Sequence, residues 1–224
     1  MHRVVACLLV VTAIATSAAA QQQQQSSPTE LAQALQKKYT GIKDFSADFV
    51  HTYRGGVLKK QIVEKGHLLI KKPGKMRWDY TSPESKQFVS DGTKVYSYIP
   101  ADKQVIVGTV PQDDTASTPA LFLTGKGDLT RDFTASFGEI PASSPVGTRA
   151  LKLVPRKAQP DYDWLVLLVD PGSLTLRGMV TADAQGGTST FSFSDLKENV
   201  GLADKEFTFR IPRGVDVITD SGAR

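Results

Sequence analysis

The sequence predicts an α+β protein that is mainly antiparallel β, with about ten or eleven strands and a few short helices. Apolar and polar residues alternate along many short segments, which is typical of strands with one buried face. Turn signals such as SDG at 90–92 and DPG at 170–172 separate these segments. Helical signals are confined to the start of the chain and its middle, so the helices are expected to cover one face of the sheet.

The first twenty residues, MHRVVACLLVVTAIATSAAA, predict a cleaved secretory signal peptide. They combine a basic start, an apolar stretch from Val4 to Ile14 and small residues at the end. This stretch is shorter than the roughly 20 residues that span a membrane. Residues 21–27, rich in glutamine, are expected to form a flexible polar spacer. The mature protein is expected to be exported and soluble, with a single domain over residues 28–224, because a chain of about 200 residues can bury one core.

Cysteine usage and charge narrow the class of protein further. The single cysteine, Cys7, lies in the predicted signal peptide, so the mature chain is expected to have no thiol, disulfide or lipid anchor of its own. Of 27 basic residues, removing Arg3 leaves 26 against 23 acidic ones, a net charge of +3. This excess is too small to indicate a nucleic acid-binding protein.

The first ordered element is predicted to be an amphipathic helix. Ser27 would cap it, Pro28 would occupy its first position and Glu30 would complete a capping box. Gly41 would end the helix. One apolar stripe is formed by Leu31, Ala34, Leu35 and Tyr39.

From Phe45 onward the period of apolar residues changes from helical to two, which favours strands. We expect strands at 45–49, 61–70, 75–80, 86–89, 96–98, 103–107, 149–154, 164–169, 174–181, 191–193 and 207–211. A short helix is expected at 118–125, where a threonine cap and a proline precede an apolar body and a terminal glycine. A further helical turn is expected at 128–133. The Pro73-Gly74 pair predicts a loop of more than two residues between two of the strands.

No pattern indicates catalysis, a metal site or a cofactor. The chain has no HExxH motif, G-x-S-x-G elbow or Walker A loop, and Gly125-Lys126-Gly127 is better explained as a helix stop. His51 and His67 are expected to be structural. The abundant apolar positions fit either a filled core or a ligand cavity, since periodicity alone does not distinguish the two. We therefore expect a binding protein rather than an enzyme.

One long run of residues carries a family resemblance. From Gly66 the chain reads GHLLIKKPGKMRWDYTSPESKQFVSDGTKVYSYIPA, preceded by FSADF at 45–49 and followed by TPAL at 118–121. KKPGKMRW, SDG and Tyr98-x-Pro100 occur in the order and spacing of the outer-membrane lipoprotein carrier protein (LolA) family, which this chain resembles over most of its mature length. The C-terminal EFTF at 206–209 is also similar.

The resemblance implies a half-open, incomplete β-barrel with short helices as a lid over an apolar cavity. It also implies a periplasmic carrier, acting as a monomer without a cofactor. Such a carrier accepts acylated lipoproteins from an inner-membrane ABC transporter, shields their acyl chains and delivers them to an outer-membrane lipoprotein receptor. The absence of a nucleotide-binding motif fits a passive carrier that a separate ATPase loads.

The resemblance also predicts site residues. The acyl-chain-binding cavity would be lined by Leu31, Leu35, Phe45, Phe49, Trp78, Tyr80, Phe88, Tyr96, Tyr98, Leu121 and Phe122. Family members often have an arginine latch to the lid immediately before the turn proline. Lys72 stands at that position here and would form a weaker latch, since lysine lacks the planar fork of donors. Pro73 and Met76 would lie at the mouth and dock the transporter, although Met76 could equally be a core methionine on the Trp78 face.

Other classes of protein remain as alternatives. A module of the same fold could bind another lipid or serve as an envelope-stress sensor domain. A small outer-membrane barrel would also have alternating strands, but the capped helices and the run at 164–169, apolar on both faces, argue against it. An exported hydrolase has no motif in its favour, and a lipid-anchored receptor would need a cysteine after the signal peptide.

Overall fold

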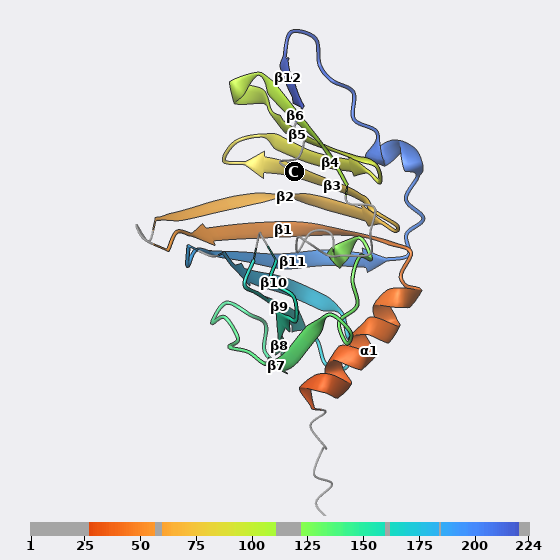
Figure 1. Cartoon of the computed structure of the whole chain (residues 1–224), viewed down its shortest axis with the longest axis vertical. Coiled ribbons are helices and arrows are strands. Elements are labelled where there is room, and N and C mark those ends of the chain that lie inside the picture. The colour runs from red at the N-terminus through yellow and green to blue at the C-terminus, as the bar shows by residue number, and fades with distance from the viewer. Residues whose placement is uncertain (1–26, 57–59, 111–121, 160–161, 184, 220–224) are drawn as a thin grey trace, which may run out of the picture.

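The computed structural model describes residues 27–56, 60–110, 122–159, 162–183 and 185–219. Within them, twelve strands form one sheet in the order β12-β6-β5-β4-β3-β2-β1-β11-β10-β9-β8-β7 (Figure 1). The elements are α1 (Pro28–Gly41), β1 (Asp44–Arg54), β2 (Gln61–Lys71), β3 (Lys75–Ser82), β4 (Lys86–Asp91), β5 (Lys94–Ile99), η1 (Pro100–Asp102), β6 (Gln104–Thr109), β7 (Phe133–Phe137), β8 (Arg149–Pro155), β9 (Trp164–Val169), β10 (Leu176–Ala182), β11 (Thr188–Glu198), η2 (Asp204–Phe207) and β12 (Asp216–Thr219). The edge strands β7 and β12 do not pair with each other, so the sheet is not closed into a barrel.

The predicted capping box of α1 is confirmed. The Glu30 backbone N–H donates to Ser27 Oγ at 3.2 Å, and the Ser27 backbone N–H donates to Glu30 Oε2 at 2.7 Å. These two bonds satisfy N–H groups that the start of a helix leaves without partners. Within the part of the chain that the structure describes, no helix has the length and apolar character needed to cross a membrane.

The strand predictions are confirmed at ten of the eleven segments, and the sheet is antiparallel except where β12 pairs in parallel with β6. The predicted strand at 207–211 is wrong. A 3-10 turn, η2, ends at Phe207, and the following residues cross the sheet instead of pairing within it. Two strands were missed, β7 and the short β12.

The predicted helical turn at 128–133 is only a turn. The Asp132 N–H donates to the Asp128 carbonyl at 2.9 Å, but Phe133 already begins β7. Asp128 Oδ1 also accepts from the backbone N–H groups of Thr130 and Arg131, at 2.8 Å each, which favours a closed turn over a continuing helix. Of the helix predicted at 118–125, residues 118–121 lie outside the described residues, while Phe122 and Leu123 are helical.

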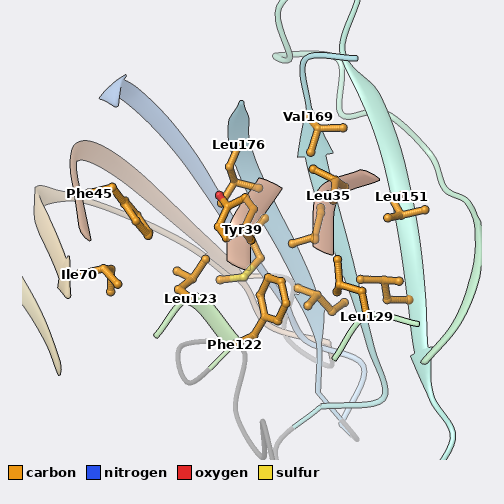
Figure 2. Close-up of a cluster of buried hydrophobic side chains, with 14 of the residues drawn as sticks. Leu35, Tyr39, Phe45, Ile70, Phe122, Leu123, Leu129, Leu151, Val169 and Leu176 are labelled. Carbon is orange, nitrogen blue, oxygen red and sulfur yellow. The ribbon is translucent and has the colours of Figure 1, made fainter. Parts of the chain in front are cut away.

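The main hydrophobic core lies on one face of the sheet, which we call the inner face. Side chains from α1, the Phe122–Leu123 turn and most of the strands meet there, and Figure 2 shows Leu35 and Tyr39 directed toward the same interior as Phe122 and Leu123. The opposite, outer face of β2 to β6 is crossed by the segment between β11 and β12.

Candidate functional site

An aromatic wall forms the centre of the inner face. The Phe49 ring lies 5.2 Å from that of Trp78 and 4.8 Å from that of Tyr80, in edge-on contacts. Tyr80 extends the wall to Phe88 at 5.7 Å, and Phe191 from β11 lies 5.2 Å from Trp78. Such edge-to-face pairs hold large apolar rings in defined positions.

The strand register explains why these residues share a face. Residues directly opposite each other in paired strands point to the same side. Trp78 pairs with Leu68 on β2 and with Phe88 on β4. Because successive side chains along a strand point to opposite faces, every second residue of each strand then lies on the same inner face. Leu68, Ile70 and Phe191 were not among the predicted wall residues, although their alternation with Phe49 and Trp78 in paired strands was the signal for them.

The cover of the wall comes from α1 and the Phe122–Leu123 turn. Leu31 and Leu35 of α1 are buried in the same cluster as the wall, and the Tyr39 ring lies 6.2 Å from that of Phe122. Leu121 lies outside the described residues. Because the cover packs directly on the inner face, the space between them is filled by the protein's own side chains in this structure.

Tyr96 and Tyr98 do not belong to the inner wall, and their predicted position is wrong. Tyr96 pairs with Val89, which neighbours the inward-facing Phe88 and therefore points outward. The rings of Tyr96 and Tyr98 lie 5.2 Å and 5.8 Å from that of Phe209. These two tyrosines form the floor beneath the outer segment that includes η2.

Lys72 joins the β2–β3 turn to the cover. Its ammonium group donates a hydrogen bond to the Tyr39 carbonyl in the last turn of α1 and lies 5.2 Å from the centre of the Tyr39 ring. Its aliphatic stem packs against Gly125, and the Gly74 N–H donates to the Thr124 carbonyl at 3.2 Å. Burial lowers the pKa of Lys72. The residue predicted as a latch therefore contacts both covering segments.

The remaining predicted residues lie on either side of this turn. Lys71 pairs with Lys75, so the loop between them has three residues, and the prediction of more than two is confirmed. Pro73 borders an open surface hollow of about 550 Å³. Met76 is 7 % exposed and belongs to the main core, which is the second of its two predicted positions. A side chain this buried does not present a docking surface in the closed protein.

His51 is held in a half-buried polar cluster. Its Nδ1 lies 3.0 Å from Glu64 Oε2, its Nε2 lies 3.3 Å from Ser189 Oγ, and its ring stacks on Phe191 at 4.2 Å. His67 is exposed and contacts Asp48 on the outer face. Over the described ranges, no three His, Cys, Asp or Glu side chains gather into a group that could hold a metal ion.

The stability of the protein is expected to fall as the pH drops below about 6.5, the ordinary pKa of histidine. Burial, together with the nearby charge of Lys86, lowers the pKa of His51 more than Glu64 raises it. Below this pH the unfolded chain binds a proton at His51 more readily than the folded protein does. The contribution of neutral His51 to the free energy of unfolding is therefore present above this pH and is lost below it. Urea unfolding at about pH 7.5 and about pH 5.5 measures the difference. His51→Gln should reduce this difference, and an unchanged difference in that variant would contradict the prediction.

Comparison with known proteins decides the family. Residues 40–210 match the family model described as "Outer membrane lipoprotein carrier protein LolA". The chain belongs to the LolA family. It is 30 % identical over 193 residues to the outer-membrane lipoprotein carrier protein of Chromohalobacter salexigens, covering 85 % of this chain and 88 % of that one. It is 35 % identical over 160 residues to the carrier of Methylobacillus flagellatus, covering 71 % and 74 %.

The LolA match contains the turn and the aromatic wall but begins at the end of α1. Lys72, Phe49 and Trp78 lie inside it, whereas Leu31 and Leu35 lie before it. Among solved structures, a LolA superfamily protein from Nitrosomonas europaea has a TM-score of 0.44 and 17 % identity, covering 80 % of this chain and 97 % of that one.

Proposed function

We propose that the protein is a periplasmic carrier that binds the acyl chains of lipoproteins released from the inner membrane and delivers them to the outer membrane. The observation that carries this proposal is the continuous apolar inner face, with its aromatic wall, beneath a separate cover. Membership of the LolA family supports it. The proposal assigns no catalytic activity to the chain.

Physical magnitudes explain why such a carrier is needed. Each methylene group removed from water contributes about 0.8 kcal/mol, so a long acyl chain resists leaving a membrane by roughly 10 kcal/mol. The inner face offers an apolar surface of the kind that would replace the membrane. Since side chains of α1 and of the Phe122–Leu123 turn fill that surface now, cargo would bind by displacing them. The empty and loaded carriers would therefore differ in the position of the cover.

We further infer that the carrier acts in the periplasm, between two membrane partners. The signal peptide predicted at residues 1–20 would export the chain, and the domain from residue 28 would act in the periplasm. An inner-membrane ABC transporter would supply the energy for loading, and an outer-membrane lipoprotein receptor would accept the cargo. Transfer to that receptor requires that it bind the acyl chains more tightly than this carrier does.

Isolation of the mature protein from periplasm, followed by mass spectrometry of what it carries, tests the proposal. We expect acylated lipoproteins in the isolated complex. They should be lost when the lipidated cysteine of the cargo is replaced, which serves as the control. Free phospholipid alone would favour the alternative, a LolA-fold module for another lipid.

Lys72→Leu is expected to loosen the cover of the empty protein. The substitution removes a charged donor to the Tyr39 carbonyl. Such bonds contribute about 1.5 kcal/mol, so amide hydrogen exchange in the last turn of α1 should quicken roughly tenfold. Amide exchange should also quicken at Gly74, whose N–H donates to the Thr124 carbonyl, and at Gly125, whose N–H donates to the Phe122 carbonyl.

Lys75→Leu is the matched control for this latch. It removes a lysine from the same hairpin, but one that pairs with Asp204 on the outer face at 3.0 Å. It should leave exchange at the end of α1 unchanged. If amide hydrogen exchange at the end of α1 is equally slow in the two variants, Lys72 is not the latch.

A further inference from the structure

A cluster of charged side chains occupies one end of the inner face. Lys86 Nζ lies 2.6 Å from Glu64 Oε1, and the other carboxylate oxygen of Glu64 lies 3.0 Å from His51 Nδ1. The side chains of His51 and Glu64 are each 14 % exposed and that of Lys86 is 25 % exposed. Three charged or titratable groups are thus mostly buried at one end of the inner face, away from the Lys72 latch.

The strand register places this cluster in line with the aromatic wall. His51 follows Phe49 by two residues on β1, so both point to the inner face. Glu64 is the partner of His51 on β2, and Lys86 is the partner of Tyr80 on β4. Lys86 Nζ lies only 4.3 Å from the centre of the Tyr80 ring. The last aromatic row of the wall is therefore in direct contact with the charges.

The apolar wall consequently has a defined length. Its first row on β1 is Phe45, beside the end of α1, and the charged row begins at His51. His51 lies six positions after Phe45 along the extended strand, which is about 20 Å at roughly 3.4 Å per residue. Figure 1 shows β1 running from the α1 end of the sheet toward its opposite side. The cluster thus marks the end of the wall that is distant from α1 and from the Lys72 latch.

An acyl chain meets different surroundings on the two sides of this boundary. Along the wall, each methylene group that leaves water raises affinity about fourfold. At the cluster, hydrocarbon would have to separate Glu64 from its partners or strip water from them, and burying charges without partners is costly. The gain in affinity with chain length should therefore stop where the chain reaches the cluster.

We propose that His51, Glu64 and Lys86 set the longest acyl chain that the carrier holds in full contact with its wall. This inference rests on the proposed function, with cargo entering beneath the cover at the α1 end. The methyl terminus of a chain that fills the wall would lie against the cluster. Methylene groups beyond that length would add no affinity. The three residues thus determine specificity for chain length without providing the main binding surface.

The test is equilibrium binding of one fixed peptide that carries a single acyl chain, in a series from dodecanoyl to eicosanoyl. For the unaltered protein, affinity should rise with chain length and then stop rising. The triple variant His51→Leu, Glu64→Leu, Lys86→Met removes all the charges together, so none is left buried without a partner. Its affinity should continue to rise, and its preference for eicosanoyl over palmitoyl should exceed that of the unaltered protein by up to about 250-fold, since four more methylene groups each raise affinity about fourfold.

The matched control removes an ion pair from the outer face, through Lys71→Met with Asp204→Leu, whose charged atoms lie 2.6 Å apart. It should keep the original chain-length profile. If the triple variant does not fold, Glu64→Gln with Lys86→Met must shift the profile in the same direction. An unchanged profile in the folded charge-free variant would overturn the length limit while leaving the carrier function intact. Failure of the unaltered protein to bind any member of the series would instead contradict the carrier function.

Discussion

Phe49→Ala is expected to lower the free energy of unfolding by about 3 to 5 kcal/mol and to weaken the binding of acylated peptides. The Phe49 side chain is 2 % exposed and contacts the rings of Trp78, Tyr80 and Phe191 at 4.8 to 6.1 Å. Its removal deletes the central ring of the wall and leaves a void that these neighbours do not fill. Urea unfolding measures the first effect. The dissociation constant of a palmitoylated peptide, measured without denaturant, gives the second.

Phe209→Ala is the control, because it removes the same side chain from an aromatic cluster on the other face. Phe209 packs on Tyr96 and Tyr98 and is only half-buried. We expect a smaller loss of stability, about 1 to 3 kcal/mol, and an unchanged dissociation constant. Equal loss of binding in both variants would mean that the acyl chains do not lie specifically against the inner wall.

Much of the sheet and the inner wall was predictable because side chains alternate along strands with a period of two. Phe45 and Phe49 on β1, and Trp78 and Tyr80 on β3, share a face for this reason. The capped helix α1 was equally evident, because Ser27 and Glu30 satisfy N–H groups that are specific to a helix start. Both features are determined by residues close together in the sequence, so the sequence alone is enough to predict them.

The predictions were wrong where contacts between segments distant in the sequence determine which face a residue occupies or whether a segment joins the sheet. Alternation shows that Tyr96 and Tyr98 share a face but not which face, and β5 is covered on its outer side by Phe209, more than 100 residues later. The same cover explains the false strand at 207–211. There the alternating Phe207 and Phe209 pack across the outer face without extending the sheet. The cluster of His51 with Glu64 and Lys86 likewise exists only once β1, β2 and β4 are aligned.

Gly66→Ala is expected to destabilise the protein by about 3 kcal/mol or more, because β2 and β3 approach too closely at this residue for any side chain. A Cβ at Gly66 would lie 2.1 Å from the Asp79 carbonyl oxygen and 2.7 Å from Phe49 Cζ. The nearer atom belongs to the backbone, so it does not move aside by rotation of a side chain. The clash would separate the two strands beside the aromatic wall. Urea unfolding monitored by tryptophan fluorescence would report the loss.

Gly108→Ala provides the contrast, since it places the same methyl group on β6 with no heavy atom of the described residues within 4 Å. This variant should be neutral or should gain up to about 1 kcal/mol, because alanine reduces the freedom of the unfolded chain. Adding Phe49→Ala to Gly66→Ala should not restore stability, since the contact with the Asp79 carbonyl remains. A stable Gly66→Ala protein would show that β2 and β3 can separate at little cost. The aromatic wall would then be easier to rearrange than its close packing indicates.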